Sequence, residues 1–306
     1  MNPMVKVDGL QKTYGATVAV EDVSFAVMEG EIFGIVGPNG AGKTTTIECL
    51  EGLRKPDKGT IQVLGKDPQH DHQFLKQRTG MQLQQSHLPE RMKVWEALDL
   101  YSSFYPNPVN WKDLLRRLGL EEKRNTAFAK LSGGQKQRLF IAMALLPDPE
   151  IIFLDELTTG LDPQARHAIW DLVREVRADG KTIVLTTHFM EEAERLCDRV
   201  AIFDRGKIVA LDTPAELIQK IGSEERIVFQ LDSVLPKEFE VEFSKTGRVE
   251  KQDDLVTIHG VQNDEPLVVH VVNQLAKYKI QYHGLRTEQA SLEDVFLKLT
   301  GKQMRE

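Results

Sequence analysis

Alternating apolar and polar residues dominate the first thirty positions of the chain. Valine and phenylalanine recur at every second position in Val5–Val7 and Val18–Val27, except for a step of three from Val20 to Val23. Turn signals at Asp8-Gly9, Tyr14-Gly15 and Glu29-Gly30 separate these runs. A period of two is typical of strands that bury one face. We therefore expect antiparallel strands ahead of residue 32.

Further along, the pattern changes to short apolar runs typical of fully buried strands, Ile32–Val36, Ile151–Leu154 and Lys181–Thr187, and then to a hairpin around Asp204-Arg205-Gly206. Between them, from about residue 86 to 145, apolar residues recur every three or four positions, which predicts a helical insert. This alternation predicts an α/β fold with a mixed sheet core, an antiparallel β subdomain and the helical insert.

The last part of the chain returns to short strands, which we expect at Ile227–Leu231, Leu255–His259 and Ile280–Tyr282, with a helix over Leu267–Lys277. We therefore expect a large domain over residues 1–222 and a small α+β domain over residues 223–306. A length of 306 residues agrees with two domains, because single cores rarely grow beyond roughly 250–300 residues.

Composition indicates the cellular compartment of the protein and the class of its partners. The two cysteines, Cys49 and Cys197, cannot build a disulfide framework, and no apolar run approaches the roughly 20 residues of a membrane helix. Without a recognisable signal peptide, we expect a cytoplasmic protein. The net charge of -7 and the lack of a basic block argue against nucleic acid as the main partner.

The run from Gly37 to Thr45 has the spacing of a phosphate-binding loop between a buried strand and a helix. Its glycines allow backbone conformations in which successive amides surround phosphates, Lys43 adds a cation, and the Thr44 hydroxyl suits Mg²⁺. We therefore expect a nucleoside triphosphate to bind here, at Gly37, Asn39, Gly40, Ala41, Gly42, Lys43, Thr44 and Thr45.

Two acids, Asp155 and Glu156, end a buried strand, where open α/β sheets bind ligands. Because buried unpaired carboxylates are costly, we assign Asp155 to the Mg²⁺ shell and Glu156 to the attacking water. His188 ends the next strand. Single histidines are commonly structural, but a position at the carboxyl end of a strand favours a functional role.

Leu131 is followed by a helix start suited to an anion, because Ser132 is a plausible N-cap and two glycines follow it. Tyr14 could stack on adenine, although a tyrosine that covers the edge of a sheet is the plainer interpretation. Gln82 and Gln84 lie at the junction to the helical insert, and only a nearby metal or phosphate would give a glutamine there a role.

These motifs resemble those of the nucleotide-binding subunit of ABC transporters, over about residues 4–220. Gly37–Thr45 is similar to the Walker A motif, Ile151–Glu156 to Walker B, and Leu131–Gln135 reads LSGGQ, the sequence that defines the family. One departure is Leu157, since the family usually has proline after the catalytic glutamate.

The resemblance implies an ATPase of the P-loop type that uses ATP and Mg²⁺. It implies adenine stacking by Tyr14 and a glutamine-loop role for Gln84 at the metal, with Gln82 as the competitor for that role. It also implies a D-loop aspartate at Asp162, a switch histidine at His188, and contact with a second cassette's ATP through Ser132, Gly133, Gly134 and Gln135.

The run Leu292–Gly301 resembles the tail of ABC-2 type exporter ATPases, including drug and antibiotic exporters. The expected partners are a second cassette, in a homodimer or heterodimer, and separate transmembrane subunits, with this chain peripheral to the inner face of the cell membrane. The same motifs also occur in soluble ATP-driven clamps that act on ribosomes, DNA or assembly scaffolds. That alternative stays open, whereas the LSGGQ motif disfavours a nucleoside kinase.

Overall fold

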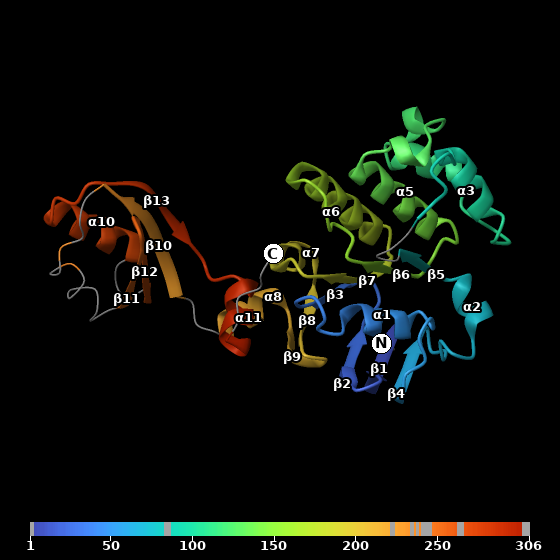
Figure 1. Cartoon of the computed structure of the whole chain (residues 1–306), viewed down its shortest axis with the longest axis horizontal. Helices are drawn as coiled ribbons and strands as arrows, with labels where there is room; N and C mark the ends of the chain where they lie inside the picture. The colour runs from blue at the N-terminus through green and yellow to red at the C-terminus, as the bar shows by residue number, and fades with distance from the viewer. Residues whose placement is uncertain are drawn as a thin grey trace. The chain divides into compact units, whose positions relative to one another are not determined.

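The computed structural model describes residues 3–82, 87–220, 224–232, 236, 239, 247–261 and 266–301. The chain divides into two compact units, one that ends at Pro214 and one that runs from Ala215 to Gly301 (Figure 1). Helix α8 (Pro214–Lys220) thus falls almost entirely in the second unit, whereas the sequence analysis assigned it to the first. None of the helices in the described residues has the length and apolarity that a membrane span requires.

The first unit begins with a three-stranded antiparallel sheet, as the alternating pattern predicted. It comprises β1 (Val5–Tyr14), β2 (Thr17–Val27) and β4 (Lys58–Val63) in the order β2-β1-β4. Val5 and Val7 of β1 are buried while Lys6 and Asp8 between them are exposed, so each strand presents one face to the core.

A six-stranded mixed sheet forms the centre of the first unit. Its order is β5-β6-β7-β3-β8-β9, parallel except for the antiparallel hairpin of β8 and β9. All residues of β3 and β6 are buried, as expected from their continuous apolar runs. The strands are β3 (Ile32–Val36), β5 (Thr79–Gln82), β6 (Ile151–Asp155), β7 (Thr182–Thr187), β8 (Arg199–Asp204) and β9 (Lys207–Asp212).

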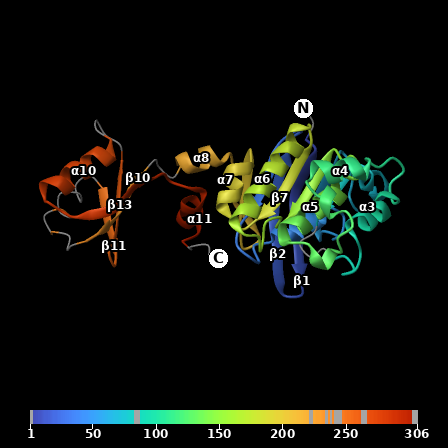
Figure 2. The same ribbon diagram turned by 90° about the horizontal axis from the view of Figure 1, so that it is seen from above.

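Helix α1 (Lys43–Leu50) lies between the two sheets (Figure 1), where Ile47 and Leu50 join a core built from both. Helices α5 (Gly133–Leu145) and α6 (Pro163–Ala178) cover the opposite face of the six-stranded sheet (Figure 2). Gly80 lets α5 approach β5 closely, since a Cβ there would lie 2.2 Å from the Ala144 carbonyl oxygen.

The expected helical insert is present between β5 and β6. It contains α3 (Val94–Ser102), α4 (Trp111–Arg117), short 3₁₀ turns at Glu121–Lys123 and Phe128–Lys130, and α5. The first unit is completed by α2 (His72–Lys76) and α7 (Met190–Leu196).

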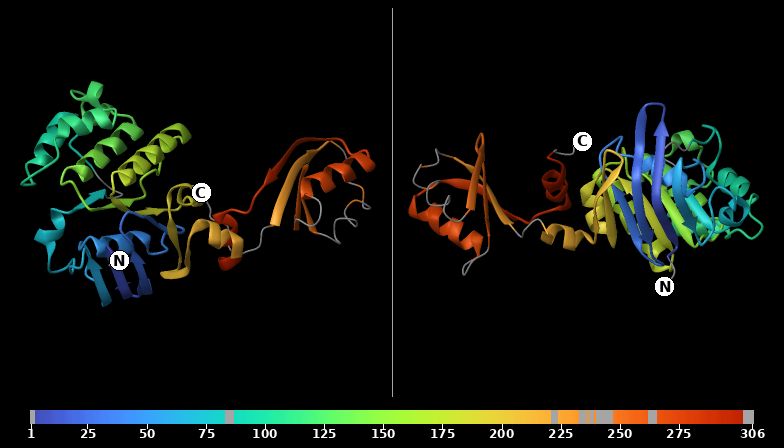
Figure 3. Two further views of the ribbon diagram at one scale, coloured as in Figure 1. Left: turned by 180° about the vertical axis from the view of Figure 1, so that it is seen from behind. Right: turned by 90° about the horizontal axis from the view of Figure 1, so that it is seen from below.

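The second unit contains a four-stranded antiparallel sheet in the order β11-β12-β10-β13, with α10 (Leu267–Lys277) along one face (Figure 3). β10 and β12, the first and third strands of this unit in chain order, are neighbours at the centre of the sheet, as in the split βαβ arrangement. Phe229 and Ile258 of the sheet pack with Val271 and Leu275 of α10 in a separate core. The strands are β10 (Glu224–Leu231), β11 (Gly247–Gln252), β12 (Leu255–Val261) and β13 (Tyr282–Glu288).

Two sequence expectations for this unit have different outcomes. The strand expected at Ile280–Tyr282 is wrong in its bounds, because β13 begins only at Tyr282. β13 is an edge strand without a fully buried residue, so its sequence lacks the apolar run that would predict a strand. The helix expected over Leu267–Lys277 is confirmed with the same bounds, as α10. Helix α11 (Leu292–Thr300) follows β13 and begins with a capping box between Ser291 and Asp294.

Candidate functional site

The loop between β3 and α1 needs its glycines for two different reasons. Gly40 and Gly42 have φ angles of 80° and 101°, in the left-handed region that favours glycine. Gly37 has no such angle, but a Cβ there would lie 2.3 Å from the Phe203 carbonyl oxygen of β8. The loop therefore combines local backbone freedom with a close approach to a neighbouring strand.

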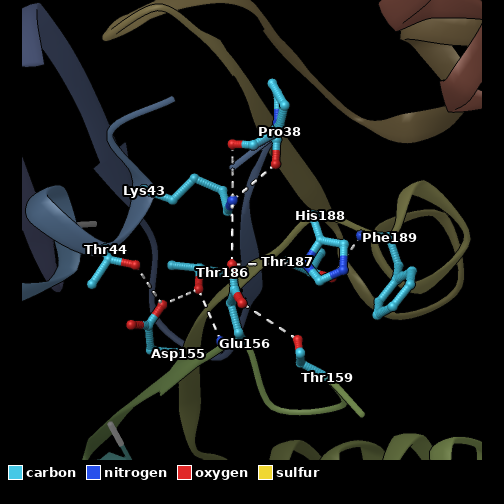
Figure 4. Close-up of polar contacts among 11 residues, drawn as sticks. Pro38, Lys43, Thr44, Asp155, Glu156, Thr159, Thr186, Thr187, His188 and Phe189 are labelled. Atoms are coloured by element: carbon cyan, nitrogen blue, oxygen red, sulfur yellow. Dashed lines mark hydrogen bonds and ion pairs between the residues drawn. The ribbon is translucent and has the colours of Figure 1, made fainter. Parts of the chain in front are cut away.

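Lys43, the first residue of α1, lies buried at the centre of this loop (Figure 4). Its Nζ donates hydrogen bonds to the carbonyl oxygens of Gly37 (2.9 Å) and Pro38 (3.2 Å) and lies 3.4 Å from Oε1 of Glu156. Burial lowers the pKa of Lys43, and the nearby Glu156 and Asp155 carboxylates oppose that shift. The ammonium is thus held at a helix N-terminus, where an anion is favoured.

Asp155 ends β6 and is 1% exposed. Its Oδ1 accepts hydrogen bonds from Oγ1 of Thr44 (3.5 Å) and from Oγ1 of Thr186. Burial raises the pKa of Asp155, with hydrogen bonds from the two threonines opposing it. A buried carboxylate beside a hydroxyl provides the oxygen ligands that Mg²⁺ prefers, so these residues fit Mg²⁺.

Glu156 follows β6 with a φ of 49°, unusual for a residue with a side chain. Its amide donates to the carbonyl oxygen (3.2 Å) and to Oγ1 (3.0 Å) of Thr186. Its carboxylate faces Lys43, accepts from Oγ1 of Thr159 at 3.4 Å, and lies 3.7 Å from Nδ1 of His188. His188 and Lys43 outweigh burial and lower the pKa of Glu156 to about 2, so Glu156 is anionic at neutral pH.

The sheet explains why residues far apart in sequence meet here. β3, β6 and β7 are parallel neighbours, with Asp155 in register with Thr186 and Val36 with Thr187. Their carboxyl ends therefore open at one edge, the usual binding position in such sheets. His188, immediately after β7, contacts the Phe189 ring at a centroid distance of 4.1 Å.

A cavity of about 380 Å³ extends from Glu156 along the loop to Tyr14, the last residue of β1. Tyr14 is 40% exposed, and Lys12 and Arg54 lie 5.7 and 5.8 Å from its ring centroid. The cavity is lined by Tyr14, Thr17, Val18, Ala19, Asn39, Gly40, Gly42, Lys43, Thr44, Thr45 and Glu156.

The LSGGQ residues lie at a separate location, the N-terminus of α5. Ser132 caps this helix, since its Oγ accepts from the Gln135 amide at 3.3 Å while Oε1 of Gln135 accepts from the Ser132 amide at 3.0 Å. Asp162 caps α6 nearby, and a Cβ on Gly134 would lie 3.3 Å from Ala165 of that helix. Over the described ranges, no hydrogen bond or ion pair joins residues 132–135 to the phosphate loop.

Two glutamines were candidates for one role, and only one of them can be placed. Gln84 lies outside the described residues. Gln82, its competitor, is buried at the end of β5. Leu157, the departure from the family pattern, is also buried.

Four residues at the site were not predicted from the sequence: Thr186 and the lining residues Thr17, Val18 and Ala19. Thr186 carried a signal, because it is polar at the carboxyl end of an otherwise apolar strand. Thr17, Val18 and Ala19 carried no such signal, because their proximity to the loop arises from the packing of the two sheets.

Comparison with known proteins agrees with this geometry. The ABC transporter family pattern matches residues 20–159. The chain is 41% identical to a Nod factor export ATP-binding protein I of Ralstonia nicotianae, over 99% of this chain and 96% of that protein. The protein of the same name from Rhizobium etli is 40% identical, over 96% of this chain and 92% of that protein.

Solved structures are similar over most of the chain. The ATP binding subunit of an ABC transporter is 32% identical with a TM-score of 0.64, covering 72% of this chain and 93% of that one. A dimeric ATP-binding cassette in a post-hydrolysis state, bound to ADP and Pi, is 29% identical with a TM-score of 0.62, covering 69% and 98%. The chain therefore belongs to the ABC transporter family, as an ATP-binding subunit with the fold and ATPase activity of its cassettes.

Proposed function

We propose that this ATPase subunit works with Mg²⁺ in a pair of cassettes and drives export through separate membrane subunits. The observation that carries the proposal is the position of Glu156, whose carboxylate lies between Lys43 and His188 beside the phosphate loop. A buried anion, a buried cation and an imidazole together at the ends of parallel strands are typical of a functional site.

The nucleotide would lie along the cavity from Tyr14 to Glu156. The loop amides, Lys43 and the N-terminus of α1 bind the β- and γ-phosphates, and the exposed Tyr14 ring stacks on adenine. Stacking of this kind contributes roughly 1–3 kcal/mol per base. Thr45 and Asn39 line the same cavity and complete the phosphate contacts.

Thr44 and Asp155 would hold Mg²⁺, with Gln84 proposed as a further ligand from the sequence alone. When bound, the ion neutralises charge on the β- and γ-phosphate oxygens. Two observations support this assignment. The Thr44 hydroxyl donates a hydrogen bond to Oδ1 of Asp155, so the two side chains lie together, and the Asp155 carboxylate is buried, which favours a cation beside it.

Glu156 would orient the attacking water. His188 and Lys43 lower the pKa of Glu156 to about 2, so the side chain is an anion that can accept a hydrogen bond from the water. Lys43 contacts Glu156 in this structure, and a γ-phosphate would compete for the same ammonium. His188 contacts the γ-phosphate and keeps the Glu156 carboxylate directed toward the loop.

A second cassette would supply the remaining contacts to the phosphates, from the amides and the partial positive charge of a helix N-terminus. The N-terminus of α5 carries Ser132, Gly133, Gly134 and Gln135, which do not line the cavity beside the phosphate loop of the same chain. In a two-fold pair, that terminus and Asp162 can face the ATP of the partner. The similar dimeric cassette supports a pair of this kind.

The transport role rests on the relatives named as export ATP-binding proteins. A subunit of this kind acts at the inner face of a membrane, where it binds membrane-spanning partners. The membrane partner would select the exported substrate.

The test is Glu156→Gln, which keeps the size of the side chain and removes its charge. We expect turnover to fall by roughly 10²-fold or more, while ATP binding persists and ATP shifts the variant to a dimer on gel filtration. Glu150→Gln is the matched control, because Glu150 pairs with Arg78 at the opposite end of β6. Full activity in Glu156→Gln would move the water-positioning role elsewhere, first to His188.

A further inference from the structure

Thr186 contacts both acids at the end of β6, although it was not among the expected site residues. It is fully buried in β7, in register with Asp155. Its hydroxyl donates to Oδ1 of Asp155 and accepts from the Glu156 amide at 3.0 Å (Figure 4). A hydroxyl has one hydrogen and two lone pairs, so both bonds form at once.

Glu156 depends on this support because of its backbone. The left-handed φ of 49° is strained for a residue with a Cβ, and such conformations persist only where neighbouring contacts impose them. Thr186 supplies two acceptors to the Glu156 amide, its Oγ1 and its carbonyl oxygen at 3.2 Å. This pair of bonds fixes the direction in which the Glu156 side chain leaves the strand.

Asp155 depends on Thr186 for its orientation. The hydroxyls of Thr44 and Thr186 both donate to the same carboxylate oxygen, Oδ1. Two donors on one oxygen fix the rotation of the carboxylate about the Cβ–Cγ bond and stabilise its anionic form. Thr44 is itself a proposed metal ligand, so Thr186 is the donor that stays in place when the metal binds.

We propose that Thr186 is a positioning residue for hydrolysis, whose single hydroxyl aligns the metal-binding carboxylate and the water-orienting glutamate together. It acts through Asp155 and Glu156, because its hydroxyl contacts these two residues and does not line the cavity beside the phosphate loop. The inference rests on the roles proposed above for these two acids. Its consequence is that metal dependence and turnover should change together when this hydroxyl is removed.

The test compares Thr186→Val, similar in size but without the hydroxyl, with Thr186→Ser, which keeps it. We expect Thr186→Val to raise the Mg²⁺ concentration needed for half-maximal binding of a fluorescent ATP analogue, and to lower kcat, each by about 10–100-fold, the usual effect of losing an outer partner of a metal ligand. Binding of the analogue without Mg²⁺ should stay unchanged. Thr186→Ser should restore both quantities to within a few-fold.

Thr182→Val is the matched control, because Thr182 is equally buried in β7 and its Oγ1 accepts from the Gly30 amide at 2.9 Å, away from the acids. It should keep the native Mg²⁺ dependence and kcat. Thermal unfolding of every variant separates these effects from loss of fold, and Thr186→Ala replaces the valine variant if the latter does not fold.

Two outcomes separate the inference from the proposed function. If Asp155→Asn impairs Mg²⁺-dependent binding but Thr186→Val behaves like Thr182→Val, the role of Thr186 is excluded while the metal assignment stands. If Asp155→Asn itself leaves the Mg²⁺ dependence unchanged, the proposed metal site is wrong, and the inference fails with it.

Discussion

The pKa values of three carboxylates near helix α1 are shifted in different directions. His188 and Lys43 lower the pKa of Glu156, whereas burial raises those of Asp155 and Glu51. Glu51 follows α1, and both of its carboxylate oxygens are buried without a hydrogen-bond partner in the described part of the chain. Glu51 has no role in the proposed mechanism and no described hydrogen-bond partner, so burying its carboxylate lowers the stability of the fold.

This cost gives a pH-dependent prediction for Glu51→Gln. A carboxyl whose pKa is raised on folding stabilises the protein at low pH, and that stability is lost as pH rises above the unfolded value of 4.5. Glu51→Gln should therefore raise the Tm of the first unit at pH 8, by about 2–4 °C for each kcal/mol regained in a domain of roughly 150–250 residues. The gain should shrink as pH approaches 4.5.

Asp57→Asn provides the contrast in the same experiment. Its hydrogen bond with Lys12 lowers the pKa of Asp57, so the wild-type contact stabilises the fold at pH values above 3.8. This variant should have a lower Tm at pH 8. A loss of Tm in Glu51→Gln at pH 8 would mean that Glu51 has a partner under those conditions.

At the scale of elements, the N-terminus of α5 is built from local hydrogen bonds. The first four amides of a helix lack partners within it, and the capping box supplies one to Gln135 through Ser132. The amides of Gly133 and Gly134 remain directed out of the helix end by its geometry. An acceptor from another chain can therefore approach this terminus, and a carboxylate placed there would repel a phosphate.

The corresponding prediction concerns Gly134→Asp. The subunit by itself should bind ATP normally, because residues 132–135 lie apart from its own phosphate loop. Hydrolysis should stop, because the new carboxylate would face the γ-phosphate of the partner's ATP. Radiolabelled ATP binding and phosphate release measure the two effects.

Gly134→Asn controls for size without charge, since any side chain here must displace Ala165, 3.3 Å from an added Cβ. It should retain more activity than the aspartate variant. Equal losses in both variants would show that crowding, and not charge, disables the helix terminus.

At the scale of the whole molecule, each chain carries both halves of the proposed composite site, but in different places. The phosphate loop and the acids at the ends of β6 and β7 form one half, and the α5 terminus forms the other. A two-fold dimer then contains two complete sites. The second unit adds a separate core to the chain.

Mixing two inactive variants tests this arrangement. Lys43→Ala lacks the loop ammonium, and Gly134→Asp lacks a usable α5 terminus, so a mixed dimer has one intact site. In an equal mixture, half of the dimers are mixed, and activity should recover to about a quarter of the wild-type value if the sites act independently. Phosphate release over a range of mixing ratios measures it, and a mixture no more active than either variant would exclude independent composite sites.

The sequence by itself determined the features that depend on near neighbours. The phosphate loop was visible because a buried strand, glycines, Lys43 and a helix start follow one another within a few residues. The capping boxes at Ser132 and Ser291 join positions three residues apart, so their hydrogen bonds were predictable. The mixed sheet followed from apolar runs alternating with helical periods, since each pattern can bury its residues in only one kind of element.

Only the tertiary structure decided which distant residues meet. Asp155, Thr186 and His188 converge because β6 and β7 pair in one register, and register is set by packing of the whole core. The same packing brings the Phe203 carbonyl against Gly37, so that this glycine is required for space and not for its φ. It also separates the α5 terminus from the phosphate loop, because long-range contacts depend on how complete elements pack and not on the order of residues within them.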